Sequence, residues 1–264
     1  MLNAYAILKK VREEKPLIHH ITNWVTIYDC ASIVRAFGAL PVMAHAAEEV
    51  EEMASIASAL VLNIGTLTPT LVESMLRAGK AANKKKIPVI LDAVGVGATK
   101  LRTESALRII REVKLAVIKG NSAEIGVLAG VKASVRGVEA AGLQGNPIEV
   151  ALRLAHKTHT TVALTGKQDV ITDGKKTMLC NNGHAMMGCL VGTGCMAASV
   201  IAAFCAVEGD PVKASTAALS CFGIAGELAA RKARGPGTFK ERLYDSVYNL
   251  DEKTVRRMQN VDEV

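Results

Sequence analysis

Short apolar runs alternate with amphipathic stretches up to residue 165, and this alternation constrains the fold more than any other feature. The runs lie at residues 17–21, 41–44, 60–64, 88–92, 115–119 and 161–165, and they are predicted strands. The stretches near 25–37, 48–58, 68–85, 103–113, 121–129 and 147–158 are predicted helices. Strands that are apolar on both faces and alternate with helices are typical of an α/β fold, in which a mainly parallel sheet is covered by helices on both faces.

The pattern changes after residue 165. Residues 170–172 and 177–180 are predicted short strands joined by a turn at Asp173-Gly174, and a second turn, Asn182-Gly183, follows. Helices are predicted near 195–207, 211–232, 238–249 and 251–259, and the glycine-rich segment 130–146 is predicted to be a surface loop. No linker, internal repeat or low-complexity stretch divides the 264 residues, so we expect a single domain spanning 1–264.

The composition excludes several classes of function. Four Phe, four Tyr and one Trp are too few for a platform that stacks single-stranded bases. The net charge of +7 includes no basic tail that would favour nucleic acid as a partner. This mild positive charge favours a phosphorylated small-molecule ligand instead.

The cysteines and one long uncharged segment indicate a reduced, cytoplasmic chain. The six cysteines include no CxxC pair, so neither a disulfide framework nor a structural zinc site is expected. Five of them lie among apolar residues and are expected in the core, the exception being Cys195. No secretory signal is visible at the N-terminus. Residues 185–207 carry no charge, but three glycines interrupt them, and their length favours a buried helix over a membrane span.

The strongest local signal is the glycine loop Gly192-Thr193-Gly194-Cys195, which is followed directly by a predicted helix. Such a loop turns several backbone N–H groups toward one point, and the helix dipole adds positive charge there, so the loop predicts an anion site. It is neither a Walker P-loop nor a dinucleotide fingerprint, and the alternative is a tight turn before a core helix. The dipole also favours the thiolate form of Cys195, which could be a base, a nucleophile or a small packing residue.

Polar residues also follow the predicted strands at the edge where open α/β sheets bind ligands. Asp92, Lys119 and Thr165 each end a strand, and Asn121 and Glu124 follow shortly after Lys119. Asp92 and Glu124 are predicted to act through water on a Mg²⁺ ion that bridges phosphates. The alternative for Asn121 and Glu124 is helix capping, because their spacing matches a capping box.

Three histidines are weaker candidates. His19 and His20 have no partner at metal-ligand spacing, so packing or hydrogen bonding is favoured over ligation. His184 follows the Asn182-Gly183 turn and could line the site.

The site residues together favour phosphoryl transfer from a nucleotide over hydride transfer. They comprise an anion-binding loop, a lysine, two acids and a hydroxyl at one sheet edge. Hydride transfer would be expected to show an N-terminal glycine fingerprint.

Seven short motifs in order carry a resemblance to a known family. They are Ile21-Thr22-Asn23, Leu40-Pro41-Val42-Met43, residues 62–67, residues 92–99, Lys119-Gly120-Asn121 with Glu124, Asn182-Gly183-His184 and the glycine loop. Together they resemble the hydroxyethylthiazole kinases, a thiamine-salvage family of the ribokinase-like superfamily. The resemblance runs from about residue 15 to residue 240. It implies a ribokinase-like fold, a homotrimer with thiazole pockets between subunits, and Mg-ATP-dependent phosphorylation of the hydroxyl group of 4-methyl-5-(2-hydroxyethyl)thiazole.

The resemblance also implies roles for particular residues. Cys195 would be the catalytic base, in place of the aspartate that most ribokinase-like enzymes carry after the glycine loop. Asp92 and Glu124 would serve Mg²⁺. The remaining roles fall into two groups: Lys119, Thr165, Asn121 and Gly194 would bind ATP, and Met43, Gly192 and Asn23 would line or adjoin the thiazole pocket.

Four positions depart from the usual form of the family, and other functions stay open. Ala93 stands where Asp-Pro is common, Leu40 replaces a small residue, Lys119 often is Arg, and Val191 replaces a common Thr. Lys119 keeps the charge but loses the guanidinium fork. The alternatives are a kinase for hydroxymethylpyrimidine or pyridoxal, a non-catalytic ATP or thiazole sensor, and a hydrolase that uses Cys195 and His184.

Overall fold

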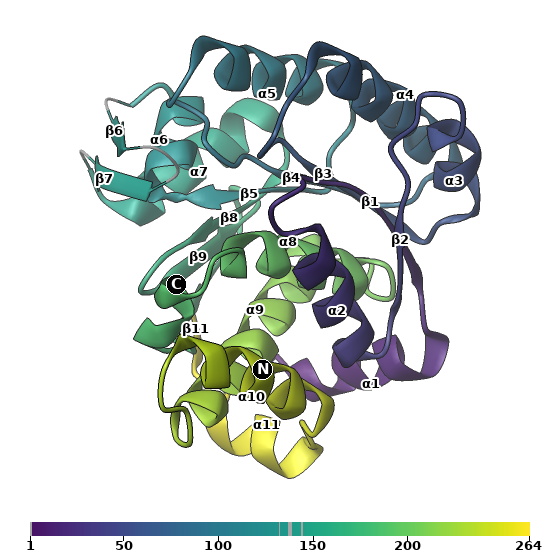
Figure 1. Cartoon of the computed structure of the whole chain (residues 1–264). Helices are drawn as coiled ribbons and strands as arrows, with labels where there is room; N and C mark the ends of the chain where they lie inside the picture. Colours follow the sequence, from purple (N-terminus) through teal and green to yellow (C-terminus); the bar gives the residue numbers. More distant parts are fainter. Residues whose placement is uncertain (1, 132, 137–138, 144) are drawn as a thin grey trace.

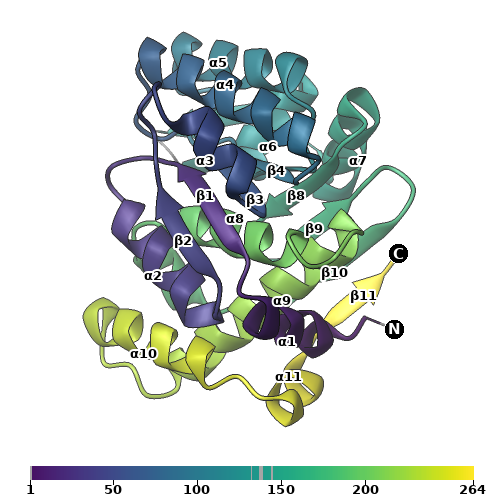
Figure 2. The same ribbon diagram turned by 90° about the vertical axis from the view of Figure 1, so that its right-hand side faces the viewer.

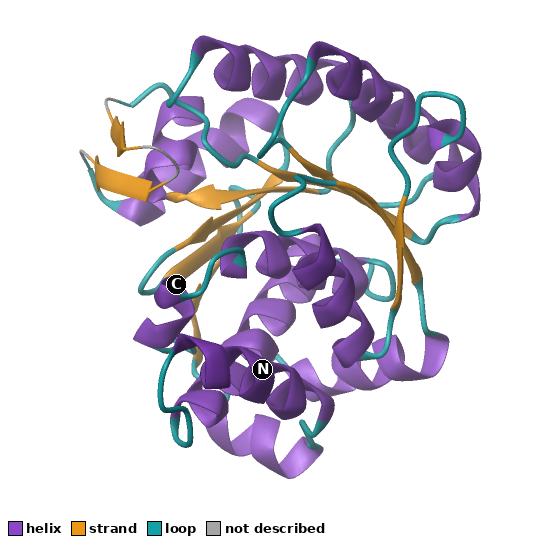
Figure 3. Ribbon diagram, viewed as in Figure 1, coloured by secondary structure: helices purple, strands orange, loops and turns teal. Residues whose placement is uncertain are grey.

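A nine-stranded sheet forms the centre of the molecule in the computed structural model, which describes residues 2–131, 133–136, 139–143 and 145–264 (Figures 1 and 3). Six neighbouring strands are parallel: β2 (Leu40–Met43), β1 (Leu17–Ile21), β3 (Ala59–Asn63), β4 (Val89–Asp92), β5 (Val117–Asn121) and β8 (Thr161–Thr165). Three antiparallel strands extend the sheet beyond β8: β9 (Asp169–Thr172), β10 (Thr177–Cys180) and β11 (Val261–Glu263). The predicted α/β class, with a mainly parallel sheet, is confirmed.

Helices cover both faces of the sheet (Figure 3). One layer contains α3 (Val50–Ile56), α4 (Pro69–Lys85), α5 (Lys100–Glu112), α6 (Ser122–Ala129) and α7 (Pro147–Thr158). The other contains α1 (Ala4–Glu14), α2 (Ile27–Phe37), α8 (Thr193–Cys205), α9 (Pro211–Ala230), α10 (Pro236–Tyr248) and α11 (Glu252–Met258). A short 3₁₀ helix, η1 (Ala185–Cys189), precedes α8.

Alternate side chains of each central strand enter different hydrophobic cores, because successive residues of a strand point to opposite faces. On β3, Val61 packs into the core beneath α2, α8 and α9, whereas Leu60 and Leu62 pack into the core beneath α4 and α5. Both cores are buried, which accounts for the nearly continuous apolar character of these strands.

Two elements at the ends of the chain were not predicted. Helix α1 was not predicted, although its apolar residues at positions 4, 7, 8 and 11 have helical spacing and are buried against the rest of the chain. Gln259 donates a hydrogen bond to the Leu2 carbonyl oxygen, so the two ends of the chain lie together (Figure 2). The short edge strand β11 was also missed.

The prediction of a loop over 130–146 was wrong for most of that segment. Strands β6 (Ala133–Arg136) and β7 (Glu139–Leu143) form an antiparallel pair there, whereas positions 132, 137–138 and 144 lie outside the described residues. Glycines in this segment indicated a loop, but the pairing of two short strands needs only a few residues on each side. Within the part of the chain that the structure describes, every helix is too short or too polar to traverse a lipid bilayer.

The two histidines of β1 are buried, as the packing interpretation predicts. His19 Nε2 lies 2.7 Å from the Ala44 carbonyl oxygen, and His20 Nδ1 lies 3.0 Å from the Ile18 carbonyl oxygen. Burial lowers the pKa of His20 to about 4, despite its backbone hydrogen bonds. His20 is therefore neutral in the folded protein at neutral pH.

We expect His20 to make the protein sensitive to acid. Its imidazole takes up a proton near pH 6.5 in the unfolded chain but only near pH 4 in the folded one, so stability is lost as pH falls through this window. When the pH falls from 8 to 5, protonation of His20 in the unfolded chain lowers the free energy of unfolding by about 2 kcal/mol. Urea unfolding of the parent and of His20→Leu at both pH values checks this. Equal changes with pH in the two proteins would contradict the expectation.

Candidate active site

Four neighbouring parallel strands deliver polar side chains to the carboxyl edge of the sheet. In the strand register, Asn63 at the end of β3 lies opposite Asp92 at the end of β4, and Asp92 lies opposite Lys119 on β5. Asn121 at the end of β5 lies opposite Thr165 at the end of β8. Parallel strands end at one edge, so residues about 30 to 45 positions apart in the chain become neighbours there. Asp92, Lys119, Asn121 and Thr165 were predicted for this site.

A buried ion pair lies at the centre of this edge. Lys119 Nζ donates to Asp92 Oδ1 at 3.1 Å, and both side chains are almost fully excluded from solvent. Burial by itself would lower the pKa of Lys119, but the carboxylates of Asp92 and Glu124 raise it above its usual value. Burial raises the pKa of Asp92, and the Lys119 ammonium opposes that rise. The Lys119 ammonium, held by Asp92, lies beside the start of α8.

The glycine loop forms the first turn of α8 rather than preceding the helix. Gly192 is the N-cap and has φ +92°, a left-handed conformation that favours glycine. A Cβ atom at Gly192 would lie 2.6 Å from Thr26 Cγ2, and one at Gly194 would lie 3.0 Å from Lys119 Nζ. The lack of side chains therefore lets the first turn of α8 approach both α2 and the lysine. The first N–H groups of a helix have no partner within it, so this turn can bind an anion.

Cys195 lies in this first turn and is buried. Asn23 Nδ2 donates to Cys195 Sγ at 3.4 Å. Burial and the nearby Asp92 carboxylate raise the pKa of Cys195, while Lys119 opposes the rise. Desolvation therefore opposes the thiolate form that the sequence argument favours at this helix N-terminus, whereas the Lys119 ammonium supports it. Among the other cysteines the core prediction holds for all but Cys189, which is exposed in η1.

Asn121 and Glu124 form the capping box that the spacing predicts. The Asn121 side chain accepts hydrogen bonds from the N–H groups of residues 123 and 124, and Glu124 Oε2 accepts from Asn121 N at 2.7 Å. Glu124 Oε1 accepts from Gly95 N at 2.7 Å, which ties the loop after β4 to α6. Burial raises the pKa of Glu124, although Lys119 opposes the rise. The capping alternative is thus confirmed, and it holds Glu124 next to the ion pair.

Sequence reasoning missed Asn63 as a site residue and left Thr26 out altogether. Asn63 Nδ2 donates to Asp92 Oδ2 at 2.6 Å, and Asn23 Nδ2 lies 2.9 Å from Thr26 Oγ1 and 3.0 Å from Asn63 Oδ1. Asn63 is the last residue of an otherwise apolar strand, and this position was the available signal. Met43 ends β2 at the same edge, but β1 separates it from β3.

A cavity of about 790 Å³ opens beside Thr165 and the start of α8. Its lining includes His184, as predicted, together with Gly194, Asp169 and Phe222. Asp169 Oδ1 accepts a hydrogen bond from Gly166 N at 3.0 Å and holds the turn after β8. The cavity therefore adjoins the anion site and is large enough for a nucleotide base and sugar.

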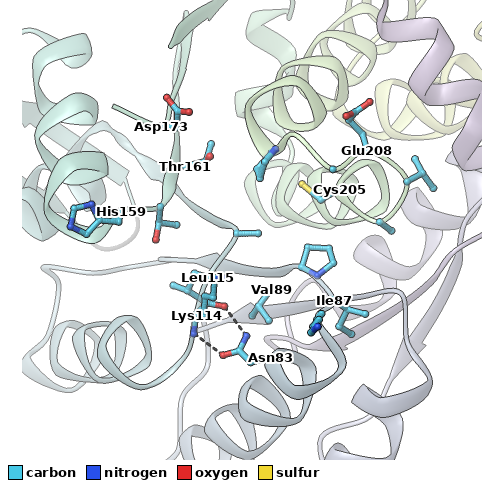
Figure 4. Close-up of a pocket in the computed structure, with 18 of the residues that line it drawn as sticks. Asn83, Ile87, Val89, Lys114, Leu115, His159, Thr161, Asp173, Cys205 and Glu208 are labelled. Carbon is cyan, nitrogen blue, oxygen red and sulfur yellow. Dashed lines mark hydrogen bonds between the residues drawn. The ribbon is translucent and has the colours of Figure 1, made fainter. Parts of the chain in front are cut away.

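A second cavity, of about 980 Å³, lies at the opposite edge of the sheet (Figure 4). It is lined by Lys114, His159 and Glu208, among others, near the starts of β5 and β8 and the end of α8. Asn83 Nδ2 donates to the Lys114 carbonyl oxygen at 2.8 Å, and Lys114 N donates to Asn83 Oδ1 at 2.7 Å. None of the predicted site residues lines this cavity, so it is separate from the candidate active site.

The architecture is that of the ribokinase-like fold. A ribokinase-like superfamily protein from Enterococcus faecalis aligns with a TM-score of 0.63 at 14% identity, over 88% of this chain and 86% of that one. A pyridoxal kinase from Staphylococcus aureus, solved with AMP-PCP and pyridoxal, aligns with the same TM-score at 16% identity, over 94% of this chain and 99% of that one. At these identities the likeness shows the ribokinase-like fold alone.

The family is shown by much closer similarity. A model of the hydroxyethylthiazole kinase family matches residues 8–253. A hydroxyethylthiazole kinase from Methanosarcina mazei is 56% identical over 257 residues, covering 97% of this chain and 98% of the relative. The structure of a hydroxyethylthiazole kinase protein from Pyrococcus horikoshii aligns with a TM-score of 0.90 at 42% identity, covering 99% and 98% of the two chains. This chain belongs to the hydroxyethylthiazole kinase family, which confirms the resemblance found in the motifs.

Proposed function

We propose that this protein transfers the γ-phosphoryl group of ATP to the hydroxyl group of 4-methyl-5-(2-hydroxyethyl)thiazole, a step of thiamine salvage. The observation that carries the proposal is the meeting of the buried Lys119–Asp92 ion pair with Cys195 at the first turn of α8. A charged lysine, an anion-binding helix start and a proton acceptor at one point are the groups that phosphoryl transfer to an alcohol requires. Family membership favours this function over the sensor and hydrolase alternatives.

ATP is the phosphoryl donor in this proposal, and four residues would bind it. Lys119 and the N–H groups around Gly194 would hold the phosphates, and Asn121 and Thr165 would lie beside them at the ends of β5 and β8. Support comes from the position of Lys119 Nζ close to Gly194 and from the cavity beside Thr165. The charge of Lys119 and the helix N-terminus both favour an anion there.

Asp92 and Glu124 would hold a Mg²⁺ ion through hydrogen bonds to its bound water. Each carboxylate oxygen already accepts one hydrogen bond, from Lys119 and Asn63 at Asp92 and from the N–H groups of residues 95 and 121 at Glu124. Among the described residues, no group of three or more His, Cys, Asp or Glu side chains could hold a metal ion by itself. Both facts fit a magnesium ion that keeps most of its water and is held mainly by phosphates. When bound, it would neutralise charge on those phosphates.

Changing these two carboxylates should raise the magnesium requirement. We expect Asp92→Asn and Glu124→Gln to need several-fold more Mg²⁺ for half-maximal turnover, because a neutral amide attracts the hydrated ion less strongly. Magnesium titrations of ADP release check this, with Glu73→Gln on the outer surface of α4 as the control. Titrations that overlay that of the parent would show that the metal assignment is wrong.

In the proposed mechanism the protein supplies position and charge. The thiazole hydroxyl would lie between Cys195 Sγ and the γ-phosphorus, in line with the bond that breaks. Cys195 acts in its thiolate form, which the Lys119 ammonium favours. As the new O–P bond forms and ADP leaves, this thiolate accepts the hydroxyl proton, while Lys119 and the N–H groups of α8 stabilise the transferred charge. Because the transition state is loose, positioning contributes more than proton removal.

The thiazole would bind next to Asn23, Met43 and Gly192, in a pocket completed by a second subunit. Large apolar side chains near these positions are exposed: Trp24 (51%), Val25 (68%), Tyr28 (76%) and Val191 (70%). An exposed apolar cluster of this kind favours burial against another chain. We propose a cytoplasmic homotrimer of single-domain subunits spanning 1–264, and light scattering should give three times the chain mass of 27.9 kDa.

The proposed function is tested by product formation. ADP release from Mg-ATP is measured with hydroxyethylthiazole, with hydroxymethylpyrimidine, with pyridoxal and without an acceptor. The mass of the product is measured by mass spectrometry. Selective turnover of the thiazole with gain of one phosphoryl group supports the proposal. Turnover of another alcohol alone keeps the kinase class but rejects the thiazole pocket, and bound ATP without turnover of any acceptor supports a sensor.

A further inference from the structure

Asn63 joins the two halves of the candidate active site. One half is the Lys119–Asp92 ion pair on β5 and β4, and the other is Cys195 at the start of α8 with Asn23 from the loop after β1. Asn63 contacts both, because its amide nitrogen donates to Asp92 Oδ2 at 2.6 Å and its amide oxygen accepts from Asn23 Nδ2 at 3.0 Å. Its side chain is almost fully buried.

The orientation of the Asn63 amide is determined by its partners. Asp92 Oδ2 can only accept from it, so the NH₂ group faces β4, and Gly65 N donates to Asn63 Oδ1 at 3.0 Å. A reversed amide would place oxygen against the carboxylate and NH₂ against the Gly65 N–H. Both ends of the side chain are therefore fixed, and buried polar networks of this kind hold their members rigidly.

Asn23 is fixed in the same way. Its Oδ1 accepts hydrogen bonds from the N–H groups of Val25 and Thr26, each at 3.0 Å, so Nδ2 faces Asn63 and Cys195. This NH₂ group has two hydrogens but three acceptors within reach: Asn63 Oδ1, Thr26 Oγ1 and Cys195 Sγ. One hydrogen satisfies Asn63, and the other is left to Thr26 or the sulfur. When the sulfur gains negative charge it attracts that hydrogen, because charged acceptors form the stronger bonds.

We infer that Asn63 is a positioning residue for the reaction: it anchors the Asn23 amide against Cys195 and holds Asp92 toward Lys119. The anchor sets the distance between the sulfur and the charge of Lys119, and small misplacements of reacting groups slow catalysis strongly. The inference rests on the proposed phosphoryl transfer for its kinetic readout only.

The test uses Asn63→Asp, which keeps the shape of the side chain but cannot donate to Asp92. We expect kcat to fall about tenfold or more, while KM for ATP and for the thiazole stays within about threefold, because the change acts on alignment rather than on ground-state binding. Asn63→Ser, which removes the bridge without adding charge, should show the same division between kcat and KM. It also provides the test if Asn63→Asp does not fold.

A second readout does not depend on turnover. Alkylation of Cys195 by iodoacetamide at pH 8, followed by peptide mass spectrometry, reports how readily this sulfur becomes a thiolate. We expect Asn63→Asp to slow alkylation of Cys195 several-fold and to leave the exposed Cys189 unchanged. The matched control is Asn83→Ala, which removes an asparagine with two backbone hydrogen bonds at the opposite edge of the sheet (Figure 4).

The outcomes separate the inference from the proposed function. If the Asn63 variants alter kcat and Cys195 alkylation no more than Asn83→Ala does, Asn63 is only structural and the inference is overturned. A parent protein without thiazole kinase activity would reject the proposed function, but the alkylation comparison would still decide whether Asn63 positions Cys195.

Discussion

Replacing Cys195 with alanine should lower kcat by about 10² to 10⁴ and leave ATP affinity within about twofold of the parent value. The range is that of general-base catalysis, because the substitution removes the proposed proton acceptor. ATP affinity should persist because the N–H groups of the first turn of α8 and the Lys119 ammonium are unaffected. Single-turnover kinetics and calorimetric ATP titration measure the two quantities separately.

Cys205→Ala is the matched control for this experiment. Cys205 is also buried and lies at the far end of the same helix, where it lines the cavity at the opposite edge of the sheet. Both variants create a similar small cavity, so a loss confined to Cys195→Ala reports chemistry and not packing. Unchanged turnover in Cys195→Ala would remove this residue from the mechanism.

Replacing Lys119 with methionine should lower the free energy of unfolding by about 3–5 kcal/mol, because Asp92 is left as an unpaired buried carboxylate. ATP affinity should also fall, because the variant lacks the proposed phosphate contact. Lys80→Met, which breaks the exposed pair with Glu112, should change the unfolding free energy by less than about 1 kcal/mol. Urea unfolding at pH 7 provides the comparison.

The pH dependence identifies the cause of the loss in Lys119→Met. Burial already raises the pKa of Asp92, and without Lys119 nothing of comparable strength opposes that rise. The folded variant then binds a proton that the unfolded chain does not, so its deficit relative to the parent should shrink as pH falls from 7 toward 5. A deficit that is constant with pH would show that lost packing, and not the unpaired carboxylate, destabilises the variant.

Much of the site could be predicted because strand ends are visible in the sequence. A parallel sheet brings the residues at the ends of its strands to one edge. The positions of Asp92, Lys119 and Thr165 at strand ends therefore predict that they lie at the same edge. The capping box of Asn121 and Glu124 was also predictable, because it depends on a spacing of three residues within one helix turn.

The remaining features depend on contacts between distant segments. The pairing of β6 with β7, and of β11 with the predicted strand β10, adds order to β6, β7 and β11, whose own residues indicate little structure. The Asn63 bridge requires β3, β4 and the loop after β1 to meet, and its residues span positions 23 to 92. No local pattern of apolar or charged residues records such a contact.

Residue patterns alone are sufficient to predict the α/β class, the edge at which polar residues gather and a helix start suited to an anion. These follow from residue periodicity and from the dipole of a helix, which act over a few residues. The pKa values of Cys195 and Lys119 are both raised, and this depends on the folded structure. Both shifts are consequences of burial and of neighbouring charges from other strands, and burial exists only once the chain has folded.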